Sequence, residues 1–553
     1  MSIVADYVER GPNWIVYTFV YFILGLQVLL VLSFFGFIFS LIPRTRPFTA
    51  WLLCDFWFWL FTWQGIRRTL TGLAILATLV AIFYTEEDWR GKRAWENCKR
   101  ELEAKGTVLD WNAYIPSPVP DDQNIFKAPK MAAWFVKLPA MPNQWHSTND
   151  FKESAEFSER LQANANTSAT ITTEPAARDY LAWSDQLHPE FDEIREALKR
   201  PYARIDGNYS QTFGIPIPNF VKVRAVAQVL AQRTKCYLLL GQPEKALNEL
   251  TLFNDLRHLL EAAPTGKPMT LVSAMINVAI TGMYVDTVAY GLQKHAWQEP
   301  QLIALQEQLK GINLMPFVAA AFEEEDVAGT HAFETDPVYK NVNLLSLYSM
   351  TVLDDYTPSS DTGTFWQRIK FWQRLKNSVY MYLELAPHGW WYQNQVTCAV
   401  IESKSLDGFD LEHDTILPRV FDEVARDLKQ ISDHKAPFNL WAAIVVPNTT
   451  KATQVLAHNQ TMVNEAQIAC ALERYRLANG DYPGTLDALS PQFIEKLPHD
   501  IIGGEPLIYR RTADGTFLLY SVGWNEKDDG GQQVTAQTKN GGTDFTKGDW
   551  VWQ

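Results

Sequence analysis

An uncharged apolar stretch, Trp14 to Ile42, limits most strongly what this chain can fold into. Its 29 residues, at about 1.5 Å each in a helix, exceed a hydrocarbon core of about 30 Å, so the segment can span a bilayer with tilt. A second apolar run, residues 69–84, is shorter. Trp89 and the Arg67–Arg68 pair are placed to anchor its ends. The sequence therefore predicts two transmembrane helices.

An aromatic segment, residues 48–66, lies between these runs. Half of residues 48–63 are Phe or Trp, Asp55 stands in the middle, and pairs of Arg flank the segment. Such residues favour the cytoplasmic headgroup region, while a third membrane segment is the alternative. Both topologies place Arg67 and Arg68 in the cytosol and everything after residue 85 outside.

The charge is unevenly distributed. The net charge is −14, and the first 85 residues carry five Arg against three acidic residues, so the remainder carries −16. An acidic ectodomain repels phosphate backbones, which argues against nucleic-acid binding. Outside the apolar region four cysteines, far apart and without a CxxC pair, are expected to be buried thiols: Cys98, Cys236, Cys398 and Cys470.

Beyond the membrane region the pattern predicts a mainly α fold. Residues 86–175 read as a stalk helix and a Pro-rich linker, 176–447 as helical hairpins, and 448–553 as a small α+β module. The stretch around Gly241, Ala246 and Leu247 resembles a tetratricopeptide repeat, but no 34-residue period follows. We expect an irregular helical solenoid or bundle.

Few residues form patterns with catalytic chemistry. The acidic run Glu323–Asp326 with His331 fits no metal-binding spacing, and a charged helix face is its simpler interpretation. Trp390, Trp391 and Tyr392 could form an aromatic platform for a glycan, or packed core. In the LEHD stretch, residues 411–414, His413 has acidic neighbours that would point in different directions on a helix. No catalysis is inferred.

The last hundred residues contain three connected motifs: ALERYRLANGDYPGTLDAL, LPHDIIGGEPLIYR, and LLYSVGWNEKDDGG followed by GDWVW. This series resembles the globular domain of the type II secretion major pseudopilin. The resemblance implies a loop that holds calcium. It places Asn525 and Asp549 at the first and last ligand positions, with Asp528, Asp529 and Asp544 nearby. Asn525 departs from the family, which has an Asp there, and this weakens the expected affinity.

The whole arrangement is similar to uncharacterised bacterial membrane-anchored envelope proteins, through WRGKRAWENCKRELEAKG, PVPDDQN and GWWYQNQ. That likeness implies the inner membrane and a periplasmic ectodomain. The Gly36–Phe37 pair lacks the Glu that pseudopilins need for assembly, so a pilus subunit is excluded. We expect a scaffold that contacts the lipid bilayer and envelope proteins. The alternatives are a glycan-binding protein or hydrolase, and an accessory component of a secretion-type complex.

Overall fold

The computed structural model describes residues 62–136, 148–167, 171–209, 212, 217–261, 270–335, 387–434, 436, 438–446, 449–535 and 543–552. The predicted span at 14–42 and residues 48–61 of the segment 48–66 lie outside these residues. Within them the chain is mainly helical, with a few small sheets, as the sequence predicts. The described residues fall into two compact units, drawn from 1–105, 341–400 and 428–446, and from 106–340, 401–427 and 447–553.

In the first unit the dominant element is α4 (Trp63–Ala104), a helix of 42 residues. Thr62 caps its start by accepting the N–H of Gly65 at 3.1 Å. At about 1.5 Å per residue the helix is about 63 Å long, and it contains the predicted span 69–84. The apolar side chains of that stretch are exposed, whereas Trp95 and Leu102 farther along are buried. Parts of α18 (Gly389–Leu406) and α19 (Pro418–Asp433), and α20 (Leu440–Val445), belong to this unit.

The second unit is built on antiparallel helix pairs. Its long helices include α9 (Phe220–Leu239), α10 (Pro243–Asp255), α12 (Leu271–Gln293), α13 (Glu299–Lys310) and α14 (Met315–Thr335). Other helical elements precede them: η1 (Trp111–Ala113), η2 (Asp121–Gln123), η3 (Ile125–Lys127), α5 (Met131–Phe135), α6 (Thr148–Thr167), α7 (Glu174–Ser184), η4 (Asp185–Leu187) and α8 (His188–Ala197). The four-residue α11 (His258–Glu261) follows α10.

The predicted break between α9 and α10 has a local cause. Gly241 takes φ of 65°, a left-handed conformation that suits glycine. Pro243 then occupies the first helical position, where a missing N–H costs nothing. The hairpin forms as the sequence predicts.

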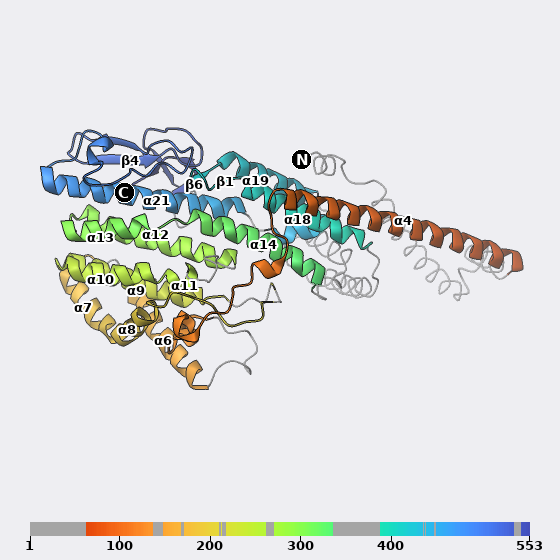
Figure 1. Cartoon of the computed structure of the whole chain (residues 1–553), viewed down its shortest axis with the longest axis horizontal. Helices are drawn as coiled ribbons and strands as arrows, with labels where there is room; N and C mark the ends of the chain where they lie inside the picture. The colour runs from red at the N-terminus through yellow and green to blue at the C-terminus, as the bar shows by residue number, and fades with distance from the viewer. Residues whose placement is uncertain are drawn as a thin grey trace, which may run out of the picture. The chain divides into compact units, whose positions relative to one another are not determined.

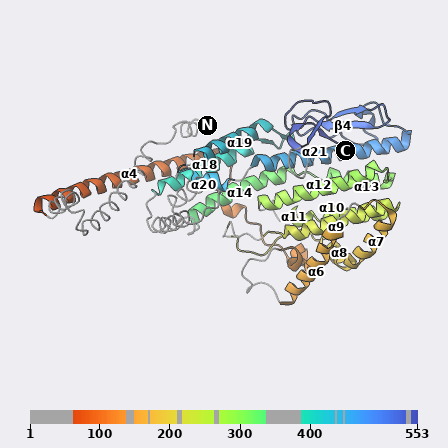
Figure 2. The same cartoon turned by 180° about the vertical axis from the view of Figure 1, so that it is seen from behind.

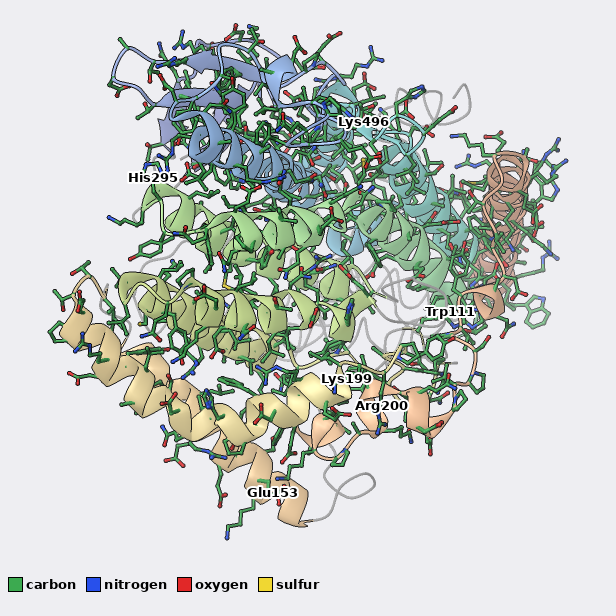
Figure 3. The ribbon with its side chains drawn as sticks, turned by 60° about the vertical axis from the view of Figure 1, so that its left-hand side comes forward. Trp111, Glu153, Lys199, Arg200, His295 and Lys496 are labelled. Atoms are coloured by element: carbon green, nitrogen blue, oxygen red, sulfur yellow. The ribbon has the colours of Figure 1, made fainter. Side chains whose placement is uncertain are left out.

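The PVPDDQN stretch is fixed by contacts with the segment after α8. The Asn124 side chain donates to the carbonyl of Arg204 at 2.7 Å and accepts the N–H of Phe126 at 3.2 Å. Arg200, labelled in Figure 3, donates through Nη1 to the carbonyls of Asp121 and Asn124 at 3.0 and 2.9 Å. The motif is a turn that hydrogen bonds to Arg200 and Arg204 hold in place.

The C-terminal residues add one long helix and small antiparallel sheets. The helix α21 (Thr449–Asn479) ends at Gly480, whose φ is 83°, as predicted. Then come η6 (Leu486–Leu489) and the predicted hairpin of β3 (Ile508–Arg511) and β4 (Phe517–Ser521), with β7 (Trp550–Val551) beside β4. Two further pairs are β1 (Phe409–Asp410) with β2 (Thr415–Ile416), and β5 (Gln533–Thr535) with β6 (Thr543–Gly548).

Helix α21 packs on α12 and α13 on one side and contacts β4 and β6 on the other. Figure 1 shows α12 and α13 between α21 and the α9–α10 pair, and Figure 2 shows the same order from behind. One hydrophobic core joins residues of α9, α12 and α13 to Ala466 and Trp550. The C-terminal strands are therefore part of the same packed body as the helical hairpins.

Candidate functional site

Two motifs that lie 300 residues apart in the sequence meet where α18 begins. Gly91 of α4 and Gly389 of α18 bring their backbones into direct contact. A Cβ built on Gly91 would lie 2.1 Å from the carbonyl oxygen of Gly389, and one on Gly389 would lie 2.0 Å from that of Glu87. No real Cβ tolerates such distances, so only glycine fits either position. We call this contact the α4–α18 clasp.

Buried polar groups complete the clasp. The carboxylate of Glu87, only 4% exposed, accepts the Trp390 indole N–H at 3.0 Å and the Gln393 amide at 3.1 Å. Arg90 lies 3.2 Å from its other oxygen. Asp88 accepts the backbone N–H of Gly389 at 2.6 Å, and so caps a helix that is remote in sequence. Donors and a cation thus surround the buried charge.

The aromatic residues proposed as a glycan platform are mostly used in this packing. Trp390 is 1% exposed and meets the Phe83 ring edge-on at 6.4 Å. Trp391 is 8% exposed. Tyr392 is half-buried against the His388 ring, 5.3 Å away. Stacking on a sugar needs an open ring face, and of the three only Tyr392 retains partial exposure.

The acidic run on α14 is divided among several contacts. Glu323 accepts the hydroxyl of Tyr114 at 2.8 Å, and Glu325 lies 3.5 Å from the N–H of Leu271 at the start of α12. His331 stacks on Trp111 with ring centroids 6.3 Å apart. The predicted charged face is therefore only partly solvated, because Glu324 and Asp326 are 1% and 2% exposed.

Asp326 has a carboxyl partner that the sequence did not reveal. It shares a side-chain hydrogen bond with Glu402 of α18, and burial raises the pKa of both groups. Two adjacent buried carboxyl groups cannot both ionise cheaply, so the pair retains a proton near neutral pH. Such a pair can exchange a proton, but Asp326 is closed to solvent. His413, by contrast, lies on an exposed turn and pairs with Asp410 at 2.8 Å.

The C-terminal loop brings together four of the five predicted calcium ligands. Asp549 is fully buried, and its oxygens accept the N–H groups of Asp529 and Gly531 at 3.1 and 2.6 Å. Asn525 donates to the Asp529 carboxylate at 2.9 Å. Asp528 accepts the Tyr520 hydroxyl at 2.9 Å.

Asp544 takes no part in these contacts and accepts the backbone and hydroxyl groups of Thr546 instead. Among the described residues, no three His, Cys, Asp or Glu side chains are grouped as metal ligands. The carboxylates of Asp528 and Asp549 accept backbone N–H groups of the loop. Calcium binding remains a prediction.

The four cysteines that the sequence assigns to buried positions are buried thiols, as expected: Cys98, Cys236, Cys398 and Cys470. Comparisons of the chain with protein family models, with curated proteins and with solved structures each find no match.

Proposed function

We propose that this protein is a membrane-anchored scaffold of the bacterial envelope, with an acidic helical body on the outer side of the inner membrane. The observation that carries the anchor is the bare apolar surface of α4. Its candidate spanning window has a mean hydropathy of 1.6 and no residue buried in the protein. Leu70, Leu79 and Ile82 are each about 60% exposed. A contiguous apolar surface of this size needs lipid or a partner to cover it.

The position of the clasp supports this arrangement. A run of exposed apolar residues extends along α4 from Leu70 to Ile82, and the buried carboxylate of Glu87 follows five residues later, with the exposed Trp89 just beyond it. A charged, hydrogen-bonded junction of this kind belongs just outside the hydrocarbon core. The Arg67–Arg68 pair at the other end of the apolar run supports a cytosolic start for the helix. Residues after 85 would then be outside.

The stacked helices of the body support the scaffold role. Stacked helices present extended faces that bind proteins without a deep pocket. The burial of Trp390 and Trp391 weakens the glycan-binding alternative. The hydrolase alternative would depend on the Asp326–Glu402 pair, and it predicts that Asp326→Asn abolishes an activity while the protein stays folded. The accessory role in a secretion-type complex rests on the pseudopilin resemblance of residues 448–553.

The anchor can be tested by carbonate extraction of membranes that contain the full chain. The wild-type protein should stay in the pellet. Because residues 14–42 are a second predicted span, the Leu73→Asp/Leu79→Asp variant is compared in a chain that lacks residues 1–61, where it should be released. Leu411→Asp, at a site that is 51% exposed in the second unit, is the matched control and should behave as wild type. Release of the wild-type protein would contradict the anchor.

The scaffold can be tested by placing a photo-crosslinking residue at Leu477 or Val534, which are 44% and 37% exposed. A discrete protein adduct from intact cells, absent when the label replaces buried Leu472, is expected. A monomer that carries bound oligosaccharide after mild detergent extraction would instead support the glycan-binding alternative. For calcium, a melting temperature that falls with chelator and recovers with calcium but not magnesium would support the prediction.

A further inference from the structure

A second buried carboxyl group, Glu465, lies in the middle of α21 where that helix meets the C-terminal sheet. Its side chain is fully buried, and its carboxyl group faces the backbone N–H of Ser521 in β4. Neither oxygen meets a side-chain donor among the described residues. An ionised carboxylate in this place would be left without a compensating charge, which is costly in a low-dielectric interior.

The neighbour of Glu465 is another acid, Asp500, which is 3% exposed. Asp500 has the hydrogen-bond donors that Glu465 lacks, although burial raises the pKa of Asp500 as well. It accepts the N–H groups of Ile502 and Val522 at 2.9 and 3.2 Å and the hydroxyl of Ser521. These hydrogen-bond donors therefore contact Asp500, and negative charge on Asp500 disfavours the ionisation of Glu465.

The other titratable groups nearby do not neutralise Glu465. His499, next to Asp500 in the chain, interacts electrostatically with Asp500 and contacts the carbonyl of Asp414 at 3.2 Å. His458, two turns earlier on α21, packs its ring against Phe545 and Trp550. Burial lowers the pKa of His458 to about 4, so it is uncharged at neutral pH. Burial, together with Asp500, raises the pKa of Glu465 well above its ordinary value of 4.5.

We propose that Glu465 keeps its proton in the folded protein and that this neutral carboxyl makes the contact between α21 and the β3–β4–β7 sheet sensitive to pH. Because the proton is held more tightly in the folded state than in the open state, its stabilising effect is complete at low pH. The effect is lost as the pH rises from the ordinary value towards the folded-state pKa. The sheet should then loosen progressively from α21 as the pH rises above the ordinary value, while the helical hairpins stay packed.

Hydrogen exchange of the full chain in detergent micelles can test this. After correction for the intrinsic pH dependence of exchange, the opening constant of peptides that cover β4 should rise by up to about tenfold per pH unit between pH 5.5 and pH 7.5. The Glu465→Gln variant keeps the size of the side chain and cannot titrate, so its β4 peptides should show no such rise. The opening constant of peptides from α9 should not change with pH in either protein.

Glu495→Gln is the matched control, because that side chain is largely exposed and pairs with Lys310 at 2.8 Å. It should keep the wild-type pH dependence. A wild-type protein whose β4 exchange does not change with pH would overturn the proposal without any variant. So would a Glu465→Gln protein with an undiminished rise. If that variant fails to fold, the wild-type titration decides alone.

Discussion

Among the described residues, two long apolar helices, α4 and α12, differ in what surrounds them. Their most apolar windows have nearly equal mean hydropathy, 1.6 and 1.5, but none of the α4 window and 56% of the α12 window is buried in the protein. Val278 of α12 is fully buried in the core of the helical body, while Leu79 of α4 is 59% exposed. Composition alone does not separate a membrane span from a core helix. Packing partners do.

The largest expected effect comes from placing a charge in each helix. Val278→Asp would bury an unpaired carboxylate and should cost about 3–5 kcal/mol, which is enough to unfold the body. In a chain that lacks the predicted span 14–42, Leu79→Asp should leave the body folded in detergent and should reduce membrane integration instead. Thermal unfolding and membrane flotation of the two variants measure the contrast. Similar behaviour of both variants would refute it.

The next effect lies at the clasp, where α4 changes from exposed to buried. Gly91→Ala would force a Cβ into the carbonyl of Gly389, and separating the two helices should cost about 3 kcal/mol. Gly72→Ala is the control, because a Cβ there meets nothing within 4 Å. The midpoint of urea unfolding, followed by a probe near α18, should fall for Gly91→Ala and stay unchanged for Gly72→Ala. An unchanged midpoint would mean that the two backbones do not touch.

A smaller loss is expected from Glu87→Gln. The amide can still accept one hydrogen bond, but it turns a donor towards Trp390 or Gln393 and removes the charge that pairs with Arg90. A cost of about 2 kcal/mol should follow. Glu86→Gln, at the exposed neighbouring position, should cost almost nothing. Equal unfolding free energies for the two variants would contradict the clasp.

The smallest effect at neutral pH is expected from Glu473→Gln, and its pH dependence is the informative part. Glu473 accepts from His295, Arg476 and Tyr482 at 2.7–3.1 Å, and Figure 3 labels His295 at the end of α12. These partners lower the pKa of Glu473 despite its burial. Its stabilising effect is therefore present above the ordinary pKa and is lost as the pH falls.

Melting temperatures of the wild-type protein and Glu473→Gln should thus converge in acid. The pKa of Glu465, eight residues earlier on the same helix, shifts in the opposite direction. Glu465 is buried beside a carboxyl group, whereas Glu473 accepts hydrogen bonds from Arg476 and His295. If the difference in melting temperature between the wild-type protein and Glu473→Gln grew in acid, the ion pairs would not set the pKa of Glu473.

Local features of the fold were predictable from the sequence. Gly241 with Pro243, and Gly480 after α21, mark chain reversals through backbone conformation alone. The hairpin of β3 and β4 follows from β-rich runs on either side of Gly515, whose φ is 83°. These signals act over a few residues, so a single sequence contains them.

The contacts at the candidate sites were not predictable in the same way. Glu402 lies 76 residues from Asp326, and Glu87 lies 303 residues from Trp390. The local sequence around Asp326 or Glu87 does not indicate which distant residue each one contacts. Trp390 is the clearest case, since an aromatic cluster beside a glycine suits a sugar platform and a helix junction equally well. The buried carboxylate of Glu87, which accepts its indole N–H, distinguishes the two.

The anchored, outward-facing arrangement is tested most directly by a topology reporter fused after Gln553, in cells that make the full chain. Alkaline phosphatase at this position should be active and a green fluorescent protein should be dark, because the body would have crossed the membrane. The opposite pair of signals would place the body in the cytosol. The envelope scaffold would then be wrong, whatever the stability of α4 and α12.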